Sequence, residues 1–322
     1  MQTVSLLSGD PIADRRADYA NMLAEAGDLQ AAAELMGEAL ALVPGWAAGW
    51  YRLGELQAEA GDAQAAALSW REALRLDPAD RMGAMLRLQL AGEPVELDAA
   101  PSAFVSALFD QYAPRFDREL VEKLGYRVPD AIAAMLADHG RNSFAHVVDL
   151  GCGTGLMGER LRAGASFIEG HDLSEGMLAR ARAKGIYDDL QRTDLASLDP
   201  GIARADLVTA ADVFIYLGRL ERVFETVAAM LVEDGLFAFS VEHHDGVGDH
   251  ALCDSRRYAH APAYVRGALE AAGLSVLKLE ETVLRMDRGQ PVAGLLVLAG
   301  KRRPVQEADT GMFSEHVTHL PG

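Results

Sequence analysis

The sequence predicts an α/β fold in which a wound sheet follows an N-terminal module built only of helices. Strand-like and helix-like segments alternate from Phe144 onward, which is the pattern of a wound α/β sheet. Residues 13–80 contain an internal repeat with a period of 34 residues, which is typical of stacked helix pairs. A turn with glycines at alternate positions (Gly151, Gly153 and Gly155) separates the first expected strand from a helix. These observations divide the chain into two parts of different architecture.

The composition is that of a soluble globular protein and excludes several other classes. Of the 322 residues, 50% are hydrophobic, which is enough for a sizeable core. The formal net charge of −18 argues against a nucleic-acid partner, because phosphate binding needs a basic patch. Two cysteines, Cys152 and Cys253, give neither a disulfide framework nor a paired zinc spacing. No export signal or membrane-spanning stretch is recognisable, so we expect a cytoplasmic protein without membrane anchoring.

The repeat is clearest when residues 23–28 are compared with residues 57–62, because both segments contain Ala-Glu-Ala-Gly-Asp. The glycine of each segment, Gly27 or Gly61, is expected to end the first helix of a pair. The match continues in the second helix of each pair, where Ala32, Glu38, Ala39, Leu40, Leu42 and Pro44 recur as Ala66, Glu72, Ala73, Leu74, Leu76 and Pro78. This pattern resembles the tetratricopeptide repeat.

A third helix is expected to begin at Ala79 and to run through Leu90, but the composition changes at Gly92. We interpret this helix as the cap of a module that spans residues 1–92. Two repeats and a cap bury little surface by themselves, so we expect the module to dock on the rest of the chain or on a second copy. The module is either a groove that binds a peptide or a structural appendage for dimerisation or stability, and we favour the structural role.

Residues 93–140 are expected to form a linker and a helical lid. Ser102 lies at the end of the linker, where it is placed to cap the next helix. Three aromatic residues in the segment 104–117 fall on one helical face, which Pro114 interrupts. They are Phe109, Tyr112 and Phe116. This face is either ordinary core or part of a lid over a ligand, and the sequence leaves both interpretations open.

The α/β part, residues 141–301, is expected to contain seven strands, near 145–150, 166–171, 186–191, 206–211, 236–241, 274–280 and 292–300. Helices are expected near 129–139, 156–164, 174–184, 219–231 and 261–272. The last two strands should form an antiparallel hairpin at the sheet edge, joined by a polar loop with Arg285, Asp287 and Arg288. Residues 302–322 show no periodicity, so we expect a mobile tail.

The stretch from Val147 to Gly155 predicts a ligand site. An apolar strand ends in Asp149 and then breaks into the glycine loop, whose backbone N–H groups a ligand can approach closely. Residues 153–158 also fit the dinucleotide pattern G-x-G-x-x-G, with Asp172 about twenty residues further on. A carboxylate at Asp149 repels a pyrophosphate and attracts a ligand with an ammonium and a sulfonium. It therefore favours S-adenosylmethionine over NAD, while a turn kept only for tight packing is the remaining alternative.

Three motifs resemble, in order and spacing, those of class I S-adenosylmethionine-dependent methyltransferases. They are residues 149–155, residues 171–174 with Met177 and Leu178, and residues 206–212. Together with the repeats and residues 109–113, they make the whole chain similar to the predicted tetratricopeptide-containing methyltransferases of bacteria. The resemblance implies a Rossmann-like sheet of seven strands and S-adenosylmethionine as cofactor.

The resemblance also implies roles for single residues. Asp149 and the neighbouring loop backbone would hold the methionine part, and Asp172 would accept hydrogen bonds from the two ribose hydroxyls. Leu173 and Met177 would flank the adenine, whose edge would meet Asp194 and Leu195. The expected cofactor-binding residues are Tyr112, Phe116, Asp149, Gly151, Cys152, Gly153, Thr154, Gly155, Asp172, Leu173, Met177, Asp194, Leu195 and Ala211.

The acceptor site is less defined, because methyl transfer from a sulfonium needs mainly positioning, exclusion of water and, for some acceptors, removal of a proton. Asp212, Tyr216 and Arg257 are expected to bind the substrate. Residues 211–216 lack the Asn/Asp-Pro-Pro-aromatic signature, which argues against DNA adenine methylation. The candidate catalytic residues are His243, His244, Tyr258 and His260, because histidine titrates near neutral pH, although a loop histidine is more often simply solvated.

Three functions remain open. The first is methylation of a small acceptor beneath a lid formed by residues 104–117. The second is methylation of a protein that the repeats recruit, and the third is a non-catalytic scaffold that binds a nucleoside. The complete glycine loop and the three acidic positions argue against the third. We expect no metal site, because His243, His244 and Asp245 are adjacent and no further ligand is identifiable. A homodimer through the helical module is also expected.

Overall fold

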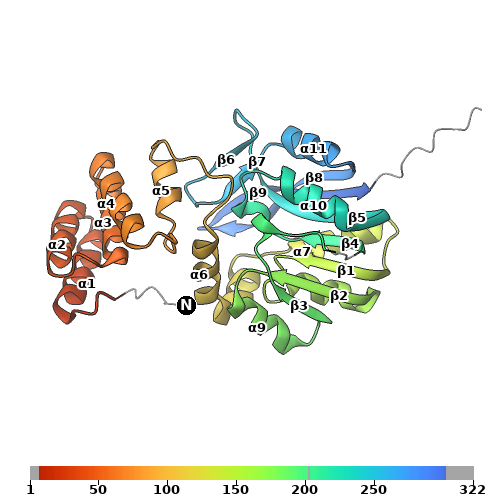
Figure 1. The fold of residues 1–322 in the computed structure, drawn as a ribbon, viewed down its shortest axis with the longest axis horizontal. Coiled ribbons are helices and arrows are strands. Elements are labelled where there is room, and N and C mark those ends of the chain that lie inside the picture. Colours follow the sequence, from red (N-terminus) through yellow and green to blue (C-terminus); the bar gives the residue numbers. More distant parts are fainter. Residues whose placement is uncertain (1–6, 202–203, 302–322) are drawn as a thin grey trace, which may run out of the picture.

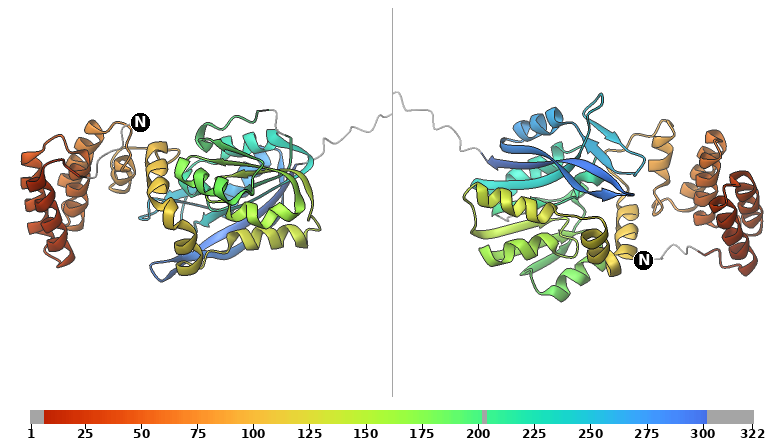
Figure 2. Two further views of the ribbon diagram at one scale, coloured as in Figure 1. Left: turned by 90° about the horizontal axis from the view of Figure 1, so that it is seen from below. Right: turned by 180° about the vertical axis from the view of Figure 1, so that it is seen from behind.

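Figure 1 shows the computed structural model of the protein, which describes residues 7–201 and 204–301. The tail expected at 302–322 lies outside the described residues. The helices of the N-terminal module lie at one end of the molecule, and helix α6 lies between them and the sheet in each view (Figures 1 and 2). The division into a helical part and an α/β part is therefore present in the structure.

The helical module consists of two antiparallel helix pairs and a short fifth helix. Its elements are α1 (Pro11–Glu25), α2 (Leu29–Leu42), α3 (Ala47–Glu59), α4 (Ala63–Leu76) and α5 (Ala84–Leu90). Asp28 and Asp62 occupy equivalent positions in the two pairs, and each carboxylate caps the helix that follows it. Gly27 and Gly61 both adopt a φ of +88°, a conformation that suits glycine at a helix end. The 34-residue spacing thus gives equivalent local structures, while membership of the tetratricopeptide family stays a prediction.

Close helix packing in the module depends on glycine at specific positions. A Cβ atom added to Gly54 of α3 would lie 2.5 Å from Nε1 of Trp70, whose ring is buried against α3. Gly37 of α2 has no heavy atom within 4 Å of the same position. Both glycines lie inside helices, where alanine is the more favourable residue. Alanine at position 54 would therefore clash with Trp70, whereas alanine at position 37 would meet no neighbour and would only remove the conformational cost of a helical glycine.

The linker and lid differ from the prediction in one detail. Helix α6 spans Ser102–Tyr112, but its N-cap residue is Pro101 and no side chain caps it. The Ser102 hydroxyl instead donates a hydrogen bond to the Asp194 carboxylate, so the predicted cap is wrong. After α6, Pro114 interrupts the helix as expected, and the chain continues as η1 (Ala113–Arg115), the π-helical turn η2 (Arg118–Lys123) and α7 (Val128–Asp138).

The α/β part is built on a single mixed sheet of nine strands. The strands are β1 (Phe144–Leu150), β2 (Ala165–Asp172), β3 (Asp189–Arg192), β4 (Ala205–Ala210), β5 (Leu231–His243), β6 (His250–Leu252), β7 (Tyr258–His260), β8 (Leu274–Asp287) and β9 (Gln290–Lys301). The order β3-β2-β1-β4-β5 is parallel, and β9 joins β5 in the antiparallel sense. The seven expected strands are present, but the prediction of seven in total is wrong, because β6 and β7 extend the sheet beside β5.

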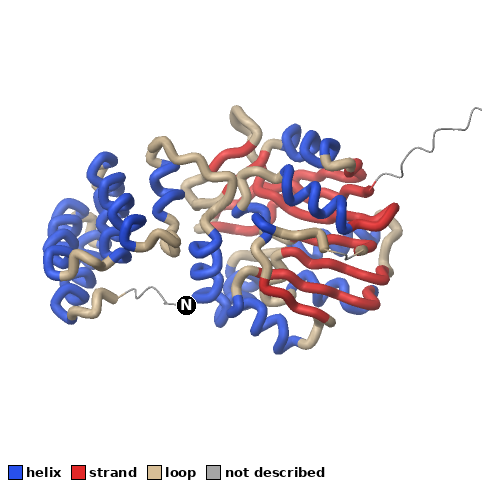
Figure 3. The backbone as a smooth tube through the Cα atoms, in the orientation of Figure 1, coloured by secondary structure: helices blue, strands red, loops and turns tan. Residues whose placement is uncertain are grey.

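Helices cover both faces of the sheet (Figure 3). They are α8 (Leu156–Leu161) followed by η3 (Arg162–Gly164), α9 (Glu175–Lys184), α10 (Glu221–Met230) and α11 (Pro262–Ala271), with short turns η4 (Leu195–Ser197) and η5 (Phe214–Tyr216). Successive strand residues enter opposite cores: Val148 packs with α10 and α11, whereas Val147 packs with α7 and α8. A strand buried on both faces explains why these segments are almost continuously apolar.

The C-terminal hairpin forms as expected, but its strands are longer than predicted. Arg285 and Asp287 lie within β8, and only Arg288 and Gly289 form the turn to β9. The predicted polar loop is therefore wrong for the first two residues. The pairing of β8 with β9 shifts register between Val283 and Arg285, which is a bulge that changes the direction of the side chains that follow.

The expected docking of the helical module is present and depends on the turn between β6 and β7. Arg256 of this turn donates hydrogen bonds from Nη1 to the Tyr51 hydroxyl (2.9 Å) and to the Met82 carbonyl (3.1 Å). Its guanidinium also lies 4.8 Å from the ring centre of Phe104 in α6. Tyr258 donates to the Leu97 carbonyl in the linker. One hairpin of the α/β part thus contacts the module, the linker and the lid helix.

We expect Gly54→Ala to destabilise the protein and Gly37→Ala to stabilise it. Overpacking against Trp70 costs roughly 1–3 kcal/mol, which exceeds the gain of about 1 kcal/mol from replacing a helical glycine by alanine. At Gly37 only the gain remains. Urea unfolding followed by circular dichroism measures both effects, and equal shifts for the two variants would show that Gly54 has no steric role.

Candidate cofactor and acceptor site

A cavity of about 330 Å³ lies at the carboxyl ends of β1, β2 and β4, beneath α6. In open α/β sheets this edge is the usual place for a ligand. The cavity wall includes the glycine loop, the ends of the first strands and the aromatic face of α6. Among its residues are Asp149, Gly151, Cys152, Gly153, Thr154, Asp172, Leu173, Met177, Asp194, Leu195, Ala211, Asp212, Tyr216, Arg257 and Arg285.

The glycine loop gives the cavity its shape more than it supplies hydrogen-bond donors. Gly151 has a φ of +63°, and a Cβ there would lie 2.3 Å from Cγ2 of Val213, so only glycine fits. The Cys152 N–H donates to the His171 carbonyl, and the Gly153 N–H donates to Asp172. Two of the three amides expected to face a ligand are therefore already bonded. The loop keeps the space beside the strand ends open for a ligand.

Tyr187, from the loop between α9 and β3, explains the match to the dinucleotide pattern. A Cβ at Gly158 would lie 2.6 Å from the Tyr187 ring, and one at Gly170 would lie 2.8 Å from it. Gly155, which is outside the cavity lining, also faces this ring at 3.1 Å. The last glycine of the pattern is therefore required for tyrosine packing and not for a pyrophosphate.

Asp149 lies at the end of β1, with a relative exposure of 1%. Its carboxylate accepts hydrogen bonds from the Tyr187 hydroxyl (2.6 Å) and from Oγ1 of Thr209 (2.8 Å). Burial raises the pKa of Asp149 to about 6, against the stabilising effect of these two donors. The two bonds fix the carboxylate at the wall of the cavity, where a positive charge on a ligand would favour its ionised form.

Asp172 lies at the end of β2, where the resemblance places the ribose hydroxyls. One carboxylate oxygen accepts from the Gly153 N–H (2.9 Å), and the other accepts from the Ser174 N–H (2.8 Å). The carboxylate also interacts with the Leu173 N–H, and its remaining lone-pair capacity is available to a ligand hydroxyl. Burial raises the pKa of Asp172 to about 6 as well. The residue therefore fits the role that the resemblance implies.

Asp194 has a second function that the sequence did not indicate. Its carboxylate caps η4 by accepting from the Ala196 N–H (2.9 Å), and it also accepts from the Ser102 hydroxyl at the start of α6. The residue lines the cavity beside Leu195 and Leu173. It therefore connects the expected adenine edge to the lid segment.

Two further carboxylates fasten the lid segment over the cavity. Asp110 of α6 accepts from the Ser174 hydroxyl (2.6 Å) and from the Gly176 N–H (3.0 Å) at the start of α9. Asp117 accepts from the Thr154 hydroxyl of the glycine loop and pairs with Lys184, with 2.8 Å between Oδ2 and Nζ. These bonds hold α6 on the elements that form the opposite wall of the cavity.

The aromatic face of the lid segment forms one wall of the cavity. Phe109, Tyr112 and Phe116 all line it, and they contact each other edge to face, with ring centres 5.5–6.1 Å apart. Phe109 also meets Tyr216 of η5 at 5.5 Å. Because these rings face the cavity, they do more than fill the protein core.

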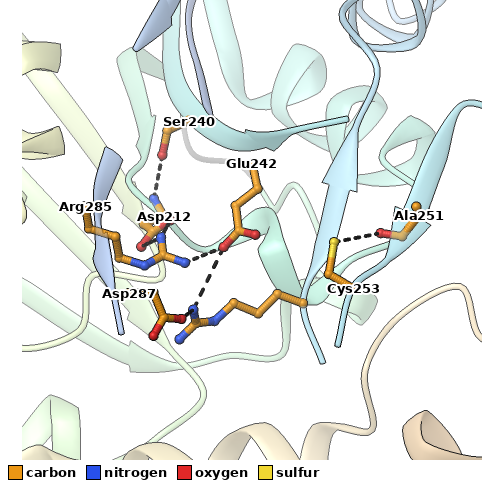
Figure 4. Close-up of polar contacts among 8 residues, drawn as sticks. Asp212, Ser240, Glu242, Ala251, Cys253, Arg285 and Asp287 are labelled. Atoms are coloured by element: carbon orange, nitrogen blue, oxygen red, sulfur yellow. Dashed lines mark hydrogen bonds and ion pairs between the residues drawn. The ribbon is translucent and has the colours of Figure 1, made fainter. Parts of the chain in front are cut away.

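A cluster of buried charges includes Asp212 and Arg285, which line the cavity, and the neighbouring Glu242 (Figure 4). Arg285 of β8 donates from Nη1 to both oxygens of Asp212 (2.7 and 2.6 Å) and from Nη2 to Glu242. Its side chain has a relative exposure of 2%. Asp212 has a φ of +59°, which is uncommon for a residue other than glycine, and its N–H donates to Ser240. Arg285 thus holds Asp212 in a strained conformation.

The comparison with known proteins agrees with this geometry. Residues 147–235 match the family described as "Methyltransferase domain". This part of the chain is therefore similar to methyltransferase domains.

Two curated relatives align with more than the matched segment. A Geobacillus sp. (strain WCH70) protein named only as a methyltransferase is 29% identical over 155 residues, which is 46% of this chain and 62% of the relative. The malonyl-(acyl-carrier protein) O-methyltransferase of Porphyromonas gingivalis is 26% identical over 204 residues, which is 60% of this chain and 75% of the relative. The chain therefore spans less than two thirds of the first relative.

A solved structure shows the same fold as the methyltransferase domain. It is the methyltransferase in a complex with the Trm112 methyltransferase activator from Haloferax volcanii, with 22% identity and a TM-score of 0.51. The match covers 61% of this chain and 98% of the other. At this identity the likeness shows the fold alone.

The structure brings nearly all the predicted binding residues of the methyltransferase domain to one cavity. Every residue predicted to bind the cofactor lines the cavity except Gly155, and so do Asp212, Tyr216 and Arg257. The sequence missed Arg285, Tyr126 and Tyr187, because polar residues in weakly apolar segments read as loops. It also missed the connections that Ser102, Asp110 and Asp117 make to the cavity wall.

Among the described residues, no cluster of His, Cys, Asp and Glu is arranged to hold a metal ion. No described helix is both long and apolar enough to cross a membrane.

The four predicted catalytic residues lie elsewhere in the methyltransferase domain, and none of them lines the cavity. His260 is fully buried and its Nε2 bonds to the Leu217 carbonyl (2.9 Å), and burial lowers its pKa to about 4. Tyr258 is buried against the linker. His243 ends β5, and His244 contacts the carbonyl of Val247 in the following loop. Their role as bases therefore has no support from the cavity lining, although the neighbouring Arg257 does line the cavity, and it stays a prediction.

The affinity for S-adenosylmethionine should fall as the pH is lowered below about 6. The pKa values of Asp149 and Asp172 lie above the ordinary value, so the folded apo protein holds these protons more tightly than the unfolded chain does. The free energy of unfolding of the apo protein therefore falls as the pH rises through about 6, because the two buried carboxylates then ionise. A ligand that needs the ionised carboxylates binds more weakly when the pH is below about 6.

At pH 5 we expect about tenfold weaker binding for each of the two carboxylates than at pH 7.5. Isothermal calorimetry across this range measures the effect. Asp172→Asn should bind weakly at every pH and show a smaller pH dependence. An affinity of the wild-type protein that does not change with pH would contradict the assignment of both carboxylates.

Arg285→Gln should destabilise the protein by about 3–5 kcal/mol, because it leaves Asp212 and Glu242 buried without a cation. The matched control is Arg160→Gln, which breaks the exposed ion pair with Asp130 and should cost less than about 1 kcal/mol. Urea unfolding compares the two variants. Losses of similar size would mean that the buried cluster tolerates water more readily than its burial suggests.

Proposed function

We propose that the protein transfers the methyl group of S-adenosylmethionine to a small-molecule acceptor by in-line displacement. One observation carries the proposal: a single cavity is lined by the three carboxylates of Asp149, Asp172 and Asp194 and also by Tyr216 and Arg257. The three carboxylates suit a cofactor with hydroxyls and positive charges, and Tyr216 and Arg257 are left for an acceptor.

In this proposal each end of the cofactor meets a side chain that the structure already fixes. Asp172 accepts from the ribose hydroxyls, and Leu173 and Met177 lie beside the adenine. Asp149 lies near the methionine part, held from behind by Tyr187 and Thr209. When bound, S-adenosylmethionine supplies an activated methyl group, so the protein has to position the acceptor and exclude water.

The lid segment suits the exclusion of water. The rings of Phe109, Tyr112 and Phe116 form an apolar wall, and Asp110 and Asp117 fasten it to the opposite side of the cavity. The name of the Porphyromonas gingivalis relative, an O-methyltransferase of malonyl-(acyl-carrier protein), supports a small acyl acceptor. A cytoplasmic location and a homodimer through the helical module belong to the same proposal.

A second cavity supports the alternative in which the helical module recruits a protein substrate. This cavity of about 370 Å³ is lined by residues of α1, α3 and α6 and by Arg256 of the β6–β7 turn. Leu108 of α6 lines both cavities, so the lid helix separates the cofactor from whatever enters the second one. A recruited protein would therefore bind on the outer side of the lid.

Calorimetry with S-adenosylmethionine and with NADH tests the cofactor assignment. We expect binding of the first only, and Asp172→Ala should weaken it by about 10- to 100-fold, because two hydrogen bonds to a charged group are lost. Asp130→Ala, which changes an exposed carboxylate, is the control. Binding of NADH, or unchanged affinity in a folded Asp172→Ala variant, would remove the proposal.

Asp18→Arg distinguishes the two acceptor classes. Asp18 is exposed and lines only the second cavity, so the substitution reverses a charge there and leaves the first cavity intact. Turnover of a small acceptor should stay within twofold of the wild-type rate. A strong loss of methylation that appears only with protein substrates would favour recruitment by the module.

A further inference from the structure

The two arginines that line the cavity differ in how fully they are paired. Both Nη atoms of Arg285 donate to carboxylates, and its side chain is almost fully buried. Arg257 has longer contacts with carboxylates, at 3.4 Å from Nη1 to Asp287 and 4.0 Å to Glu242, and its side chain is 27% exposed. Its other side-chain partner is the neutral hydroxyl of Tyr216. Asp287 is 40% exposed, and an exposed partner stabilises a cation only weakly. Arg257 is therefore the cation with hydrogen-bonding capacity left for a ligand.

Apart from Asp149, Asp172 and Asp194, which the proposed function assigns to the cofactor, the described wall of the cavity offers no side chain suited to removing a proton from an acceptor. It contains no histidine and no lysine among the described residues. Both carboxylate oxygens of Asp212 already accept hydrogen bonds from Nη1 of Arg285, so they are not free to face an acceptor. Burial raises the pKa of the Cys152 thiol well above its usual range, so this group stays protonated. An acceptor that is already a nucleophile needs none of these groups.

We propose that the acceptor is a carboxylic acid with an apolar body, whose carboxylate is bound by Arg257. The inference rests on the proposed function and names its substrate class. A carboxylate is ionised near neutral pH, so it requires no base, and it pairs with a guanidinium through two parallel hydrogen bonds. Apolar side chains of the lid segment and of the chain that follows it line the cavity, among them Leu108, Leu120 and Leu124, and they suit an apolar body.

The reaction is then balanced without any proton transfer. A carboxylate oxygen attacks the methyl carbon of the sulfonium, the new C–O bond forms, and the C–S bond breaks with its electron pair going to sulfur. The products are a methyl ester and S-adenosylhomocysteine. Arg257 orients the carboxylate and is released from an anion when the neutral ester forms, which favours exchange of product for substrate.

The test uses the full chain and a series of straight-chain carboxylic acids with the matching primary amides and alcohols. Binding to the protein loaded with S-adenosylhomocysteine is measured by calorimetry. Methyl transfer is measured with tritium-labelled S-adenosylmethionine, and mild alkali then releases methanol from esters but not from ethers or methylated amines. We expect acids to bind and amides and alcohols not to bind, with the label released by alkali.

Three variants give the test its controls. Arg257→Gln should weaken acid binding by about 10- to 100-fold and leave the affinity for S-adenosylmethionine within twofold. Arg257→Lys should recover part of the loss, because it keeps the charge but not the planar pair of donors. Arg266→Gln, at an exposed position on α11, should change neither affinity.

The outcomes separate this inference from the proposed function. A wild-type protein that does not bind S-adenosylmethionine would remove the proposed function itself. Binding of the cofactor with no preference for acids over amides would overturn the carboxylate inference alone. A label that is stable to alkali, or acid binding that is unchanged in Arg257→Gln, would overturn it as well.

Discussion

The acceptor end of the cavity depends on one buried guanidinium. Arg285 connects Asp212 at the end of β4 to Glu242 in β5, and all three side chains are largely removed from water. Burying a charge is costly unless it is paired, so the arginine offsets the cost of burying the two carboxylates. The arginine also holds Asp212 at a positive φ, and this bend directs the chain from β4 toward the cavity wall. Three strands that are distant in the sequence are thereby fixed relative to each other at one site.

The carboxylates proposed to bind the cofactor could be placed in one cavity from the sequence because they follow a local rule. Asp149, Asp172 and Asp194 each come at or just after the end of a successive parallel strand, and such ends meet at one edge of the sheet. Strand periodicity alone therefore places them together. The alternation of helices and strands and the 34-residue repeat similarly gave the two parts of the fold, because both are patterns between near neighbours in the sequence.

The acceptor half could not be predicted in the same way. Arg285 reads as a loop residue because a polarity pattern does not distinguish a solvated arginine from a buried one whose partners are 43 and 73 positions away. The histidines after β5 read as candidate bases because the short strands β6 and β7, three residues each, are too brief to show a period. Tyr187 lies in a loop, and only its packing on three glycines reveals its role behind Asp149.

The β6–β7 hairpin imposes a constraint on how this protein can change. Three consecutive residues serve three places: Arg256 contacts the helical module, Arg257 lines the cavity, and Tyr258 contacts the linker. A shift of one residue in the pairing would move every side chain to the wrong partner. An insertion or deletion in this hairpin would therefore disturb the interface and the cavity together. The contacts of the helical module with the α/β part thus depend on the register of one pair of strands. A homologous helical module or α/β part could replace the present one only if it kept that register.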